Sequence, residues 1–250
     1  MSTSPQLTIV LPPPIPGAEV SCTRYLARQP ILDREQNTHA YELLFRSGPQ
    51  NFFSACDPDA ATASVIDYSL HLGFRQLTGG HLAFINCTRN ILLLDLIAAL
   101  PADWAIVELL EDVLADAETL AACDRLRRAG YRIALDDYVP TPNTRRLLPF
   151  ADIVKVDFLA TDAARQTAIA DEMHRRGIRL LAEKVETREQ FNFAQSLGYH
   201  YFQGYLLGKP ETLSTQDIPC SKLAYARLPS LLPGHWNRRS CASHHSVTVC

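Results

Sequence analysis

Eight short apolar, β-rich segments, most of them separated by helical patterns, are the feature that most constrains the fold of this chain. They span residues 25–32, 39–45, 82–86, 105–110, 131–136, 152–157, 178–183 and 199–204. Strands that alternate with helices predict an α/β protein whose strands run parallel and are joined by helical crossovers. Eight such units in one domain predict a (β/α)8 barrel of the TIM type.

The first two segments depart from this alternation. Residues 33–38, "DREQNT", join them by a link of hairpin size that contains no helical pattern. We therefore expect a barrel that begins with an antiparallel strand. The rival fold, an open doubly wound sheet, would be favoured by a glycine-rich phosphate loop after the first strand, and the sequence has none there.

Four of the crossovers carry recognisable helix signals. Apolar residues recur with a period of about 3.6 residues over 59–72 and again over 116–129. Thr161 is interpreted as the N-cap of a helix that continues to Arg176, and Thr187 as the N-cap of the next helix. These four segments are therefore predicted to be helices on the outside of the barrel.

The composition of the chain limits which classes of protein it can belong to, and its two ends indicate where the domain begins and stops. We expect residues 1–22 to form a flexible leader, 23–212 a barrel domain and 213–250 a tail. The formal net charge of −3 does not indicate a DNA-binding patch, and no apolar run reaches the roughly 18 residues that a membrane span needs. Seven cysteines without C-x-x-C spacing are typical of reduced thiols, so we expect a cytoplasmic protein.

Polar side chains end most of the predicted strands. They are Asn86, Glu108, Asp136, Asp137, Lys155, Glu183 and Gln203, together with Glu42 inside the second strand and Glu186 three residues after Glu183. Barrel enzymes place their chemistry at the carboxyl ends of the strands, where these groups would meet on one rim. Each residue alone has a structural reading as a helix cap, a first-turn acid or an ion-pair partner. The joint pattern indicates a functional site.

So many carboxylates cannot share a small rim as bare anions, because neighbouring like charges and desolvation both raise carboxyl pKa values. A divalent cation resolves this conflict. An oxygen-rich ligand set without cysteine or histidine favours Mg²⁺ or Mn²⁺ over zinc. Two ions about 3.5–4 Å apart would support an in-line phosphoryl displacement by water. Lys155 would orient or deprotonate that water, or balance the charge.

The sequence motifs around these residues match those of one known family. The segments "YELLFR" (41–46), "ALDDY" (134–138), "VKVD" (154–157) and "AEKVET" (182–187) are similar to its E-A-L-L-R, L-D-D-F-G, K-I-D and A-E-G-V-E-T motifs. The segments "ARQPILD", "FIN", "VELLED" and "FQGYLLGKP" are similar to its Q-P-I strand, its asparagine strand end and its E-[LI]-T-E and Q-G-Y…K-P motifs. Over roughly residues 24–210 the chain thus resembles EAL domains, the cyclic-di-GMP phosphodiesterases.

The resemblance implies a role for each matched residue. Glu42, Asn86, Glu108 and Asp136 would bind one Mg²⁺ or Mn²⁺ ion, and Asp136, Asp137 and Glu186 a second. Lys155 would place the attacking water, with Glu183 and Glu186 as further catalytic residues, and Gln29, Arg46 and Gln203 would contact the substrate. The substrate would be cyclic di-GMP and the product linear pGpG.

Two departures from the family pattern bear on activity. The motif reads Glu-Leu-Leu rather than Glu-Ala-Leu, with Leu43 in place of the alanine. The loop after the two aspartates, residues 138–148, reads "YVPTPNTRRLL" where active members carry a glycine-rich segment. Proline fixes φ and removes a donor, so this loop is rebuilt. In the family the loop serves the second metal site and dimerisation and is braced by the glutamate that Glu111 matches.

The variant resembles the EAL half of EAL–HDOD signalling proteins, and residues 218–232 resemble the start of an HDOD domain, the rest of which we interpret as missing, truncated or frame-shifted. Three hypotheses follow. The first is a metal-dependent cyclic-di-GMP hydrolase, slow because of the loop. The second is a catalytically silent module that binds cyclic di-GMP or docks a signalling partner, as a homodimer or otherwise. The third is a divergent metal-dependent barrel enzyme acting on another substrate.

Overall fold

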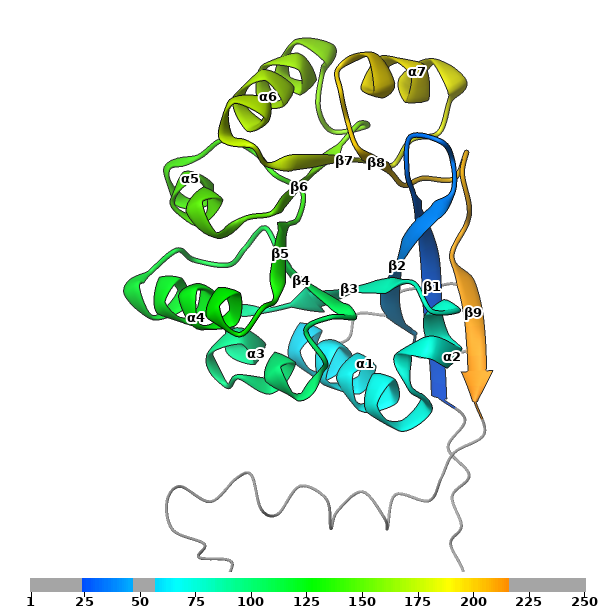
Figure 1. The fold of residues 1–250 in the computed structure, drawn as a ribbon, viewed down its shortest axis with the longest axis vertical. Helices are drawn as coiled ribbons and strands as arrows, with labels where there is room; N and C mark the ends of the chain where they lie inside the picture. The colour runs from blue at the N-terminus through cyan, green and yellow to red at the C-terminus, as the bar shows by residue number, and fades with distance from the viewer. Residues whose placement is uncertain (1–23, 47–56, 216–250) are drawn as a thin grey trace, which may run out of the picture. The chain divides into compact units, whose positions relative to one another are not determined.

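The computed structural model of the protein describes residues 24–46 and 57–215 (Figure 1). The predicted leader and the HDOD-like stretch at 218–232 lie outside the described residues, as does nearly all of the predicted tail. Residues 24–215 form one compact unit. No helix in this part of the chain combines the length and the apolar character that crossing a membrane requires.

Eight strands close into a barrel, which Figure 1 shows end-on as a ring. They are β1 (Arg24–Leu32), β2 (Thr38–Arg46), β3 (Leu82–Cys87), β4 (Ala105–Leu109), β5 (Arg132–Leu135), β6 (Ile153–Asp157), β7 (Arg179–Glu183) and β8 (Tyr201–Phe202). Strands β2 to β8 pair in parallel, and β1 closes the ring by pairing antiparallel with both β2 and β8. The predicted barrel with an antiparallel first strand is confirmed.

The helices lie outside the ring (Figure 1). They are α1 (Pro58–Leu72), α2 (Phe74–Thr78), α3 (Arg89–Leu93), α4 (Ala117–Arg128), α5 (Pro142–Leu147), α6 (Ala163–Arg176) and α7 (Arg188–Ser196), with 3-10 turns at Leu96–Ala99 and Leu148–Phe150. The two helices predicted from apolar spacing are confirmed as α1 and α4. The short helices α2, α3 and α5 span too few residues to show a helical period in the sequence.

Side-chain caps fix where the longer helices begin. Thr187 caps α7 as predicted, because its hydroxyl accepts a hydrogen bond from the amide of Gln190 at 3.2 Å. The prediction that Thr161 caps α6 is wrong. Asp162 does so, with its carboxylate accepting from the Arg165 amide at 2.8 Å. Both residue types favour the capping position, and a carboxylate adds a favourable interaction with the positive end of the helix.

A ninth strand, β9 (Glu211–Thr215), was not predicted, because its sequence carries a single apolar side chain. It pairs antiparallel with the first half of β1, from Arg24 to Arg28. Strand β8 is short and reaches β1 only at Leu32, so the first half of β1 would otherwise be an open sheet edge. The pairing of β9 therefore covers a backbone edge that the eight-stranded ring leaves exposed.

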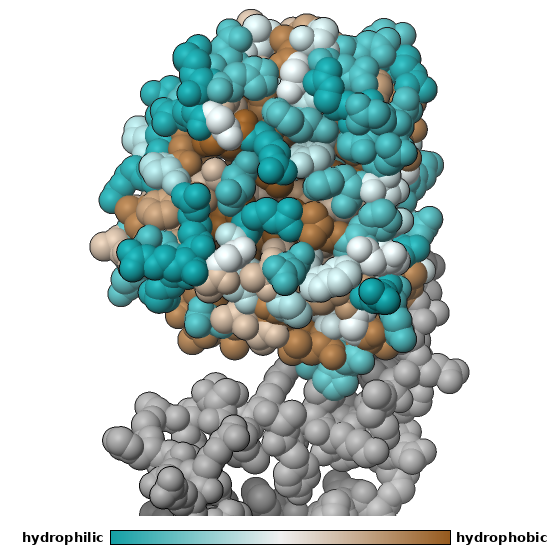
Figure 2. All heavy atoms as spheres, viewed as in Figure 1, coloured by the Kyte–Doolittle hydropathy of each residue, from teal (hydrophilic) through white to brown (hydrophobic). Residues whose placement is uncertain are grey.

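The barrel interior is filled by one apolar layer and is not a pore. Figure 2, drawn from the same side as Figure 1, shows side chains occupying the centre of the ring. One buried cluster takes residues from every barrel strand and none from the helices: Ile31, Ala40, Phe84, Ile106, Ala134, Ile153, Leu181 and Tyr201. A larger cluster packs the outward faces of the strands against the helices. The barrel thus has separate inner and outer cores.

We expect Phe84→Ala to destabilise the protein by about 3–5 kcal/mol, because Phe84 is fully buried in the inner layer and the neighbouring strands cannot move in to fill the cavity. The control Leu94→Ala removes an apolar side chain that is 68% exposed and should change stability by less than about 0.5 kcal/mol. Urea unfolding followed by circular dichroism measures both. An equal loss of unfolding free energy in the two variants would contradict the described inner core.

Candidate active site

A polar layer lies directly on the apolar layer inside the barrel, because side chains two residues apart on a strand share a face. Each apolar inner residue is followed two positions later by a polar residue, and in the antiparallel strand β1 it is preceded by one. The pairs are Ile31/Gln29, Ala40/Glu42, Phe84/Asn86, Ile106/Glu108, Ala134/Asp136, Ile153/Lys155, Leu181/Glu183 and Tyr201/Gln203. The predicted strand-end residues therefore come from seven strands, β2 to β8, and Gln29 of β1 completes the layer that faces one site.

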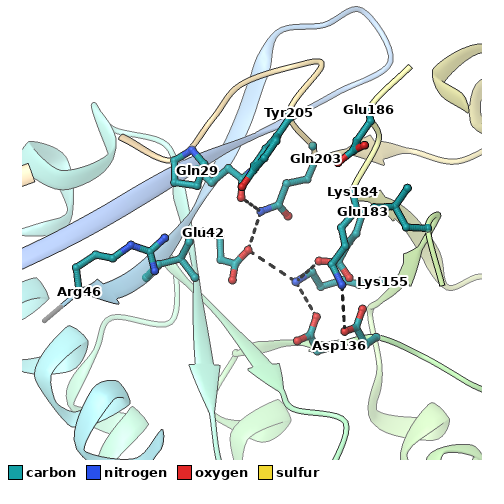
Figure 3. Close-up of a pocket in the computed structure, with 15 residues that line it drawn as sticks. Gln29, Glu42, Arg46, Asp136, Lys155, Glu183, Lys184, Glu186, Gln203 and Tyr205 are labelled. Carbon is teal, nitrogen blue, oxygen red and sulfur yellow. Dashed lines mark hydrogen bonds and ion pairs between the residues drawn. The ribbon is translucent and has the colours of Figure 1, made fainter. Parts of the chain in front are cut away.

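Lys155 is the centre of this layer. Its Nζ lies 2.8 Å from Asp136 Oδ1, 2.8 Å from Glu183 Oε1 and 3.9 Å from Glu42 Oε2 (Figure 3). The same Nζ also contacts Glu108 Oε1. The Lys155 side chain is 1% exposed and that of Glu108 is fully buried. A single buried ammonium thus faces four carboxylates from four different strands.

Amide side chains hold the other side of the layer in place. Gln203 Nε2 donates to Glu42 Oε2 at 2.7 Å and to Gln29 Oε1 at 3.1 Å. Asn86 Nδ2 donates to the second Glu42 oxygen at 3.3 Å, and Gln29 Nε2 donates to the carbonyl of Gly208 at 3.1 Å. Both oxygens of Glu42 are therefore oriented by neutral donors.

The charges in this layer shift one another's pKa values. Burial lowers the pKa of Lys155, but the carboxylates around it outweigh burial and hold that pKa well above its ordinary value. Burial raises the pKa of Glu108 well above its usual range and that of Glu183 to about 8, although Lys155 opposes both shifts. Burial raises the pKa of Asp136, but the charge of Lys155 and its hydrogen bond outweigh burial, so that the pKa of Asp136 is lowered. Lys155 is therefore a stable cation, and the pKa of Asp136 shifts in the opposite direction to those of Glu108 and Glu183.

Several buried oxygens of the site have no hydrogen-bond partner among the described residues. They are Glu108 Oε2, Asp137 Oδ1, Glu183 Oε2 and Gln203 Oε1. Oxygens of Asp136, Asp137 and Glu183 also lie within 4.8 Å of one another. Unpartnered buried acceptors are costly, and hard divalent cations take oxygen ligands of this kind. The residues present therefore fit a divalent metal ion.

Two residues beside this layer have backbone angles that side-chain-bearing residues rarely adopt. Asp137 has φ 39° and Lys184 has φ 53°. The Lys184 ammonium contacts Asp157 Oδ2 and lies 3.6 Å from Asp137 Oδ2. Sequence reasoning missed Lys184 as a site residue. The signal was the lysine in "AEKVET" at the position where the matched motif has glycine.

A cavity of about 420 Å³ opens on the polar layer. Gln29, Glu42, Asp136, Asp137, Lys155, Glu183 and Gln203 line it, together with the predicted Arg46 and Glu186. Tyr205, which was not predicted, lines it as well and is 61% exposed. Glu186 is exposed, and no hydrogen bond or ion pair holds its carboxylate within the described segments. Asn86 and Glu108 belong to the same polar layer but do not line the cavity.

The chain approaches itself closely at Gly204, next to this cavity. Its φ is 156°, and a Cβ at this position would lie 2.2 Å from the carbonyl oxygen of Val185. Only glycine fits such an approach. Gly204 therefore allows the segment carrying Gln203 and Tyr205 to lie against the segment that follows Glu183.

The glycine-free loop after Asp137 is built around a helix start. The Tyr138 amide donates to the Lys155 carbonyl at 2.9 Å, Thr141 caps α5, and Pro142 is the first helical residue. Proline suits that position because the first helical amide needs no partner inside the helix. The loop is thus tied to β6 beside Lys155 without the conformational freedom of glycine.

Asn143 anchors this loop to the segment after β4. Its Oδ1 accepts from the Ala115 amide at 2.7 Å, and its Nδ2 donates to the Val113 carbonyl at 2.9 Å. Glu111 is exposed, and among the described residues no hydrogen bond or ion pair joins it to the loop. The supporting role of Glu111 therefore stays a prediction.

Comparisons with known proteins agree with this geometry. The uncharacterized protein YuxH of Bacillus subtilis strain 168 is 35% identical over 210 residues, which cover 82% of this chain and 51% of YuxH. The cyclic di-GMP phosphodiesterase CdgJ of Vibrio cholerae is 36% identical over 207 residues, which cover 81% of this chain and 48% of CdgJ. The chain thus spans about half the length of these relatives.

Solved structures share the fold. A manganese and cyclic-di-GMP complex of BlrP1 from Klebsiella pneumoniae matches with a TM-score of 0.60 and 25% identity, over 82% of this chain and 59% of that one. YkuI of Bacillus subtilis, solved with cyclic di-GMP and calcium, matches with a TM-score of 0.61 and 21% identity. The match covers 80% of this chain and 59% of the YkuI chain.

The model of the EAL domain family matches residues 64–210. This match covers more than half of the chain and includes the segments that carry Asn86, Glu108, Asp136, Lys155, Glu183 and Gln203, while Glu42 precedes it. The layered barrel and the family match lead to the same conclusion: this chain belongs to the EAL domain family.

Proposed function

We propose that this domain hydrolyses cyclic di-GMP to linear pGpG with the help of Mg²⁺ or Mn²⁺, as a cytoplasmic signalling protein. The observation that carries this proposal is the set of unpartnered buried oxygens around a lysine at the floor of the cavity. The name of CdgJ and the ligands of the BlrP1 complex support the choice of substrate and of a divalent metal.

The residues of the polar layer divide into a ligand set and a charge-balancing group. Glu42, Asn86, Glu108 and Asp136 would hold one ion, with Asp136, Asp137 and Glu186 available for a second. A bound divalent ion supplies Lewis-acid stabilisation of the charge on a phosphoryl oxygen. The amide donors of Gln203 and Asn86 orient Glu42 for this task.

Lys155 is better suited to orient water than to deprotonate it. Its pKa is held well above the ordinary value by the surrounding carboxylates, so it remains an ammonium at neutral pH. An ammonium donates hydrogen bonds and accepts none. Lys155 would hold the attacking water by its oxygen and stabilise negative charge on the phosphoryl group.

Two residues at the edges of the cavity suit the rest of the substrate. Arg46 presents a guanidinium, the group best matched to a phosphate. Tyr205 offers an exposed aromatic face on which a base can stack. The cavity thus combines a carboxylate floor with a phosphate-binding and a base-stacking group.

The second candidate function is binding without turnover, and the rebuilt loop favours it. Pro140 and Pro142 stiffen the loop that begins directly after Asp137. If catalysis needs this loop to move, the same cavity would act as a cyclic-di-GMP receptor or as a docking module for a signalling partner or a second copy.

The direct test is incubation of the purified 250-residue chain with cyclic di-GMP and Mn²⁺ or Mg²⁺, with EDTA as the control. We expect metal-dependent formation of pGpG, separated from substrate by liquid chromatography. Calorimetric binding in the same preparations distinguishes the candidates, because a receptor binds cyclic di-GMP and leaves it intact. Absence of both binding and turnover would refute both functions.

We expect Glu42→Gln to lower the turnover rate by about 10²-fold or more, because it replaces a ligand carboxylate by an amide of the same shape. The matched control is Glu211→Gln, which neutralises an exposed carboxylate paired with Arg28 and should keep the parent rate. Initial rates of pGpG formation measure both, and circular dichroism checks that both are folded. A Glu42→Gln variant with the parent rate would remove Glu42 from the site.

The raised pKa of Glu183 predicts a pH dependence of stability. The folded chain holds this proton up to about pH 8, whereas the unfolded chain releases it near the ordinary value of 4.5. The stabilisation that Glu183 provides is therefore present below pH 4.5 and is lost as pH rises to about 8.

Glu183→Gln removes this titration. In EDTA, the stability of the variant relative to the parent should rise by more than about 1.4 kcal/mol between pH 5 and pH 8. Urea unfolding of both proteins at the two pH values measures the difference, in which the contributions of titrating groups that do not interact with Glu183 cancel. A constant difference would show that Glu183 is ionised throughout this range.

A further inference from the structure

Lys184 places a second positive charge at the candidate active site. It follows Glu183 at the end of β7 and lines the same cavity. Its Nζ contacts Asp157 Oδ2 and lies 3.6 Å from Asp137 Oδ2. Figure 3 shows its side chain directed toward the carboxylates below the cavity. This ammonium therefore lies beside Asp137, one of the two consecutive aspartates.

The backbone at Lys184 has a conformation that lysine rarely adopts. With φ at 53° it lies in the left-handed region, which glycine adopts freely and lysine does not. Residues held there persist when the surroundings fix them and cluster at functional sites. Half of the side chain is exposed, yet its charged end contacts carboxylates.

The anchor of this ammonium is itself rigid. Asp157 Oδ1 accepts hydrogen bonds from the amides of Leu159 at 2.6 Å and Ala160 at 2.9 Å. Its other oxygen, Oδ2, is the one that contacts Lys184. Asp157 is thus an ionised group in a fixed position, and moving Lys184 away would break a charge-assisted hydrogen bond.

We propose that Lys184 Nζ serves as a tethered cation in place of a second divalent ion beside Asp137, so that this site binds one divalent ion instead of two. The ion is held by Glu42, Asn86, Glu108 and Asp136. A divalent ion on Asp137 would lie next to the ammonium, and two cations at this range repel each other. The inference rests on the proposed metal-dependent function and sets the number of ions.

The role of Lys184 in the reaction follows from its place. A second ion would neutralise Asp137 and stabilise charge on the phosphoryl group. Lys184 supplies one positive charge that would both neutralise Asp137 and stabilise the phosphoryl group. Because this charge belongs to a side chain, it is present at any metal concentration. The domain would therefore reach full activity when a single ion binds.

The test counts bound Mn²⁺ ions in the purified full chain by electron paramagnetic resonance, in which free Mn²⁺ gives the signal. We expect one ion per chain for the parent and two for Lys184→Gly, since glycine adopts this backbone and removes the charge. Lys184→Gln, which keeps the length of the side chain, should also bind two. Two ions about 3.5–4 Å apart should in addition give a spin-coupled spectrum at low temperature.

Arg188→Gln is the matched control. It removes an exposed positive charge four residues further on, where α7 begins, and Arg188 packs over the ring of Phe191 away from the carboxylates. This variant should keep one ion. A gain of a second ion in Arg188→Gln would attribute the effect to net charge and overturn the proposal.

Two other outcomes would also overturn the proposal. Two ions of similar affinity in the parent would show that Lys184 moves aside, and one ion in both Lys184 variants would show that its charge does not decide the number. In either case the proposed metal-dependent function stands. If neither the parent nor the Lys184 variants bind Mn²⁺, the one-ion site and the metal-dependent function fail together.

Discussion

The rest of the site depends on one buried ammonium. Lys155 lies among four carboxylates in the interior of the barrel, where unpaired acids would be protonated or would force the strands apart. Its charge keeps Asp136 ionised, while Glu108 and Glu183 hold their protons more tightly. The layer therefore leaves buried carboxylate oxygens without a partner among the described residues, and this observation supports the proposed metal-dependent reaction.

The sequence alone predicts the barrel and most of its polar layer, because both follow from a period of two residues along each strand. An apolar residue that packs the interior is paired with a polar one a single layer away, as with Ile153 and Lys155. Strand-end residues could thus be assigned to one site without coordinates. The resemblance to a family added the roles of Gln29 and Arg46, which no strand-end pattern marks.

The features that the sequence did not reveal depend on tertiary contacts. Strand β9 forms because an edge of β1 is open, and its own residues carry little strand signal. Asp162 and not Thr161 caps α6, a choice between adjacent residues that only the backbone settles. Lys184 becomes a site residue through its left-handed backbone angle and its contact with Asp157. Departures from a family motif are therefore the positions at which a structure adds most.

The antiparallel seam of the barrel has a mechanical consequence. Arg24 pairs with Thr215, so the first and last described residues of the barrel lie side by side on β1 and β9. Arg28 pairs with Glu211 at the other end of this ribbon, and the next residue is Gln29, which hydrogen-bonds to Gln203 in the polar layer. The β1–β9 ribbon is therefore joined by two adjacent residues, Arg28 and Gln29, to the edge of the cavity. A change in the pairing of β9 with β1 would thus act next to the polar layer, through residues that are neighbours in the chain.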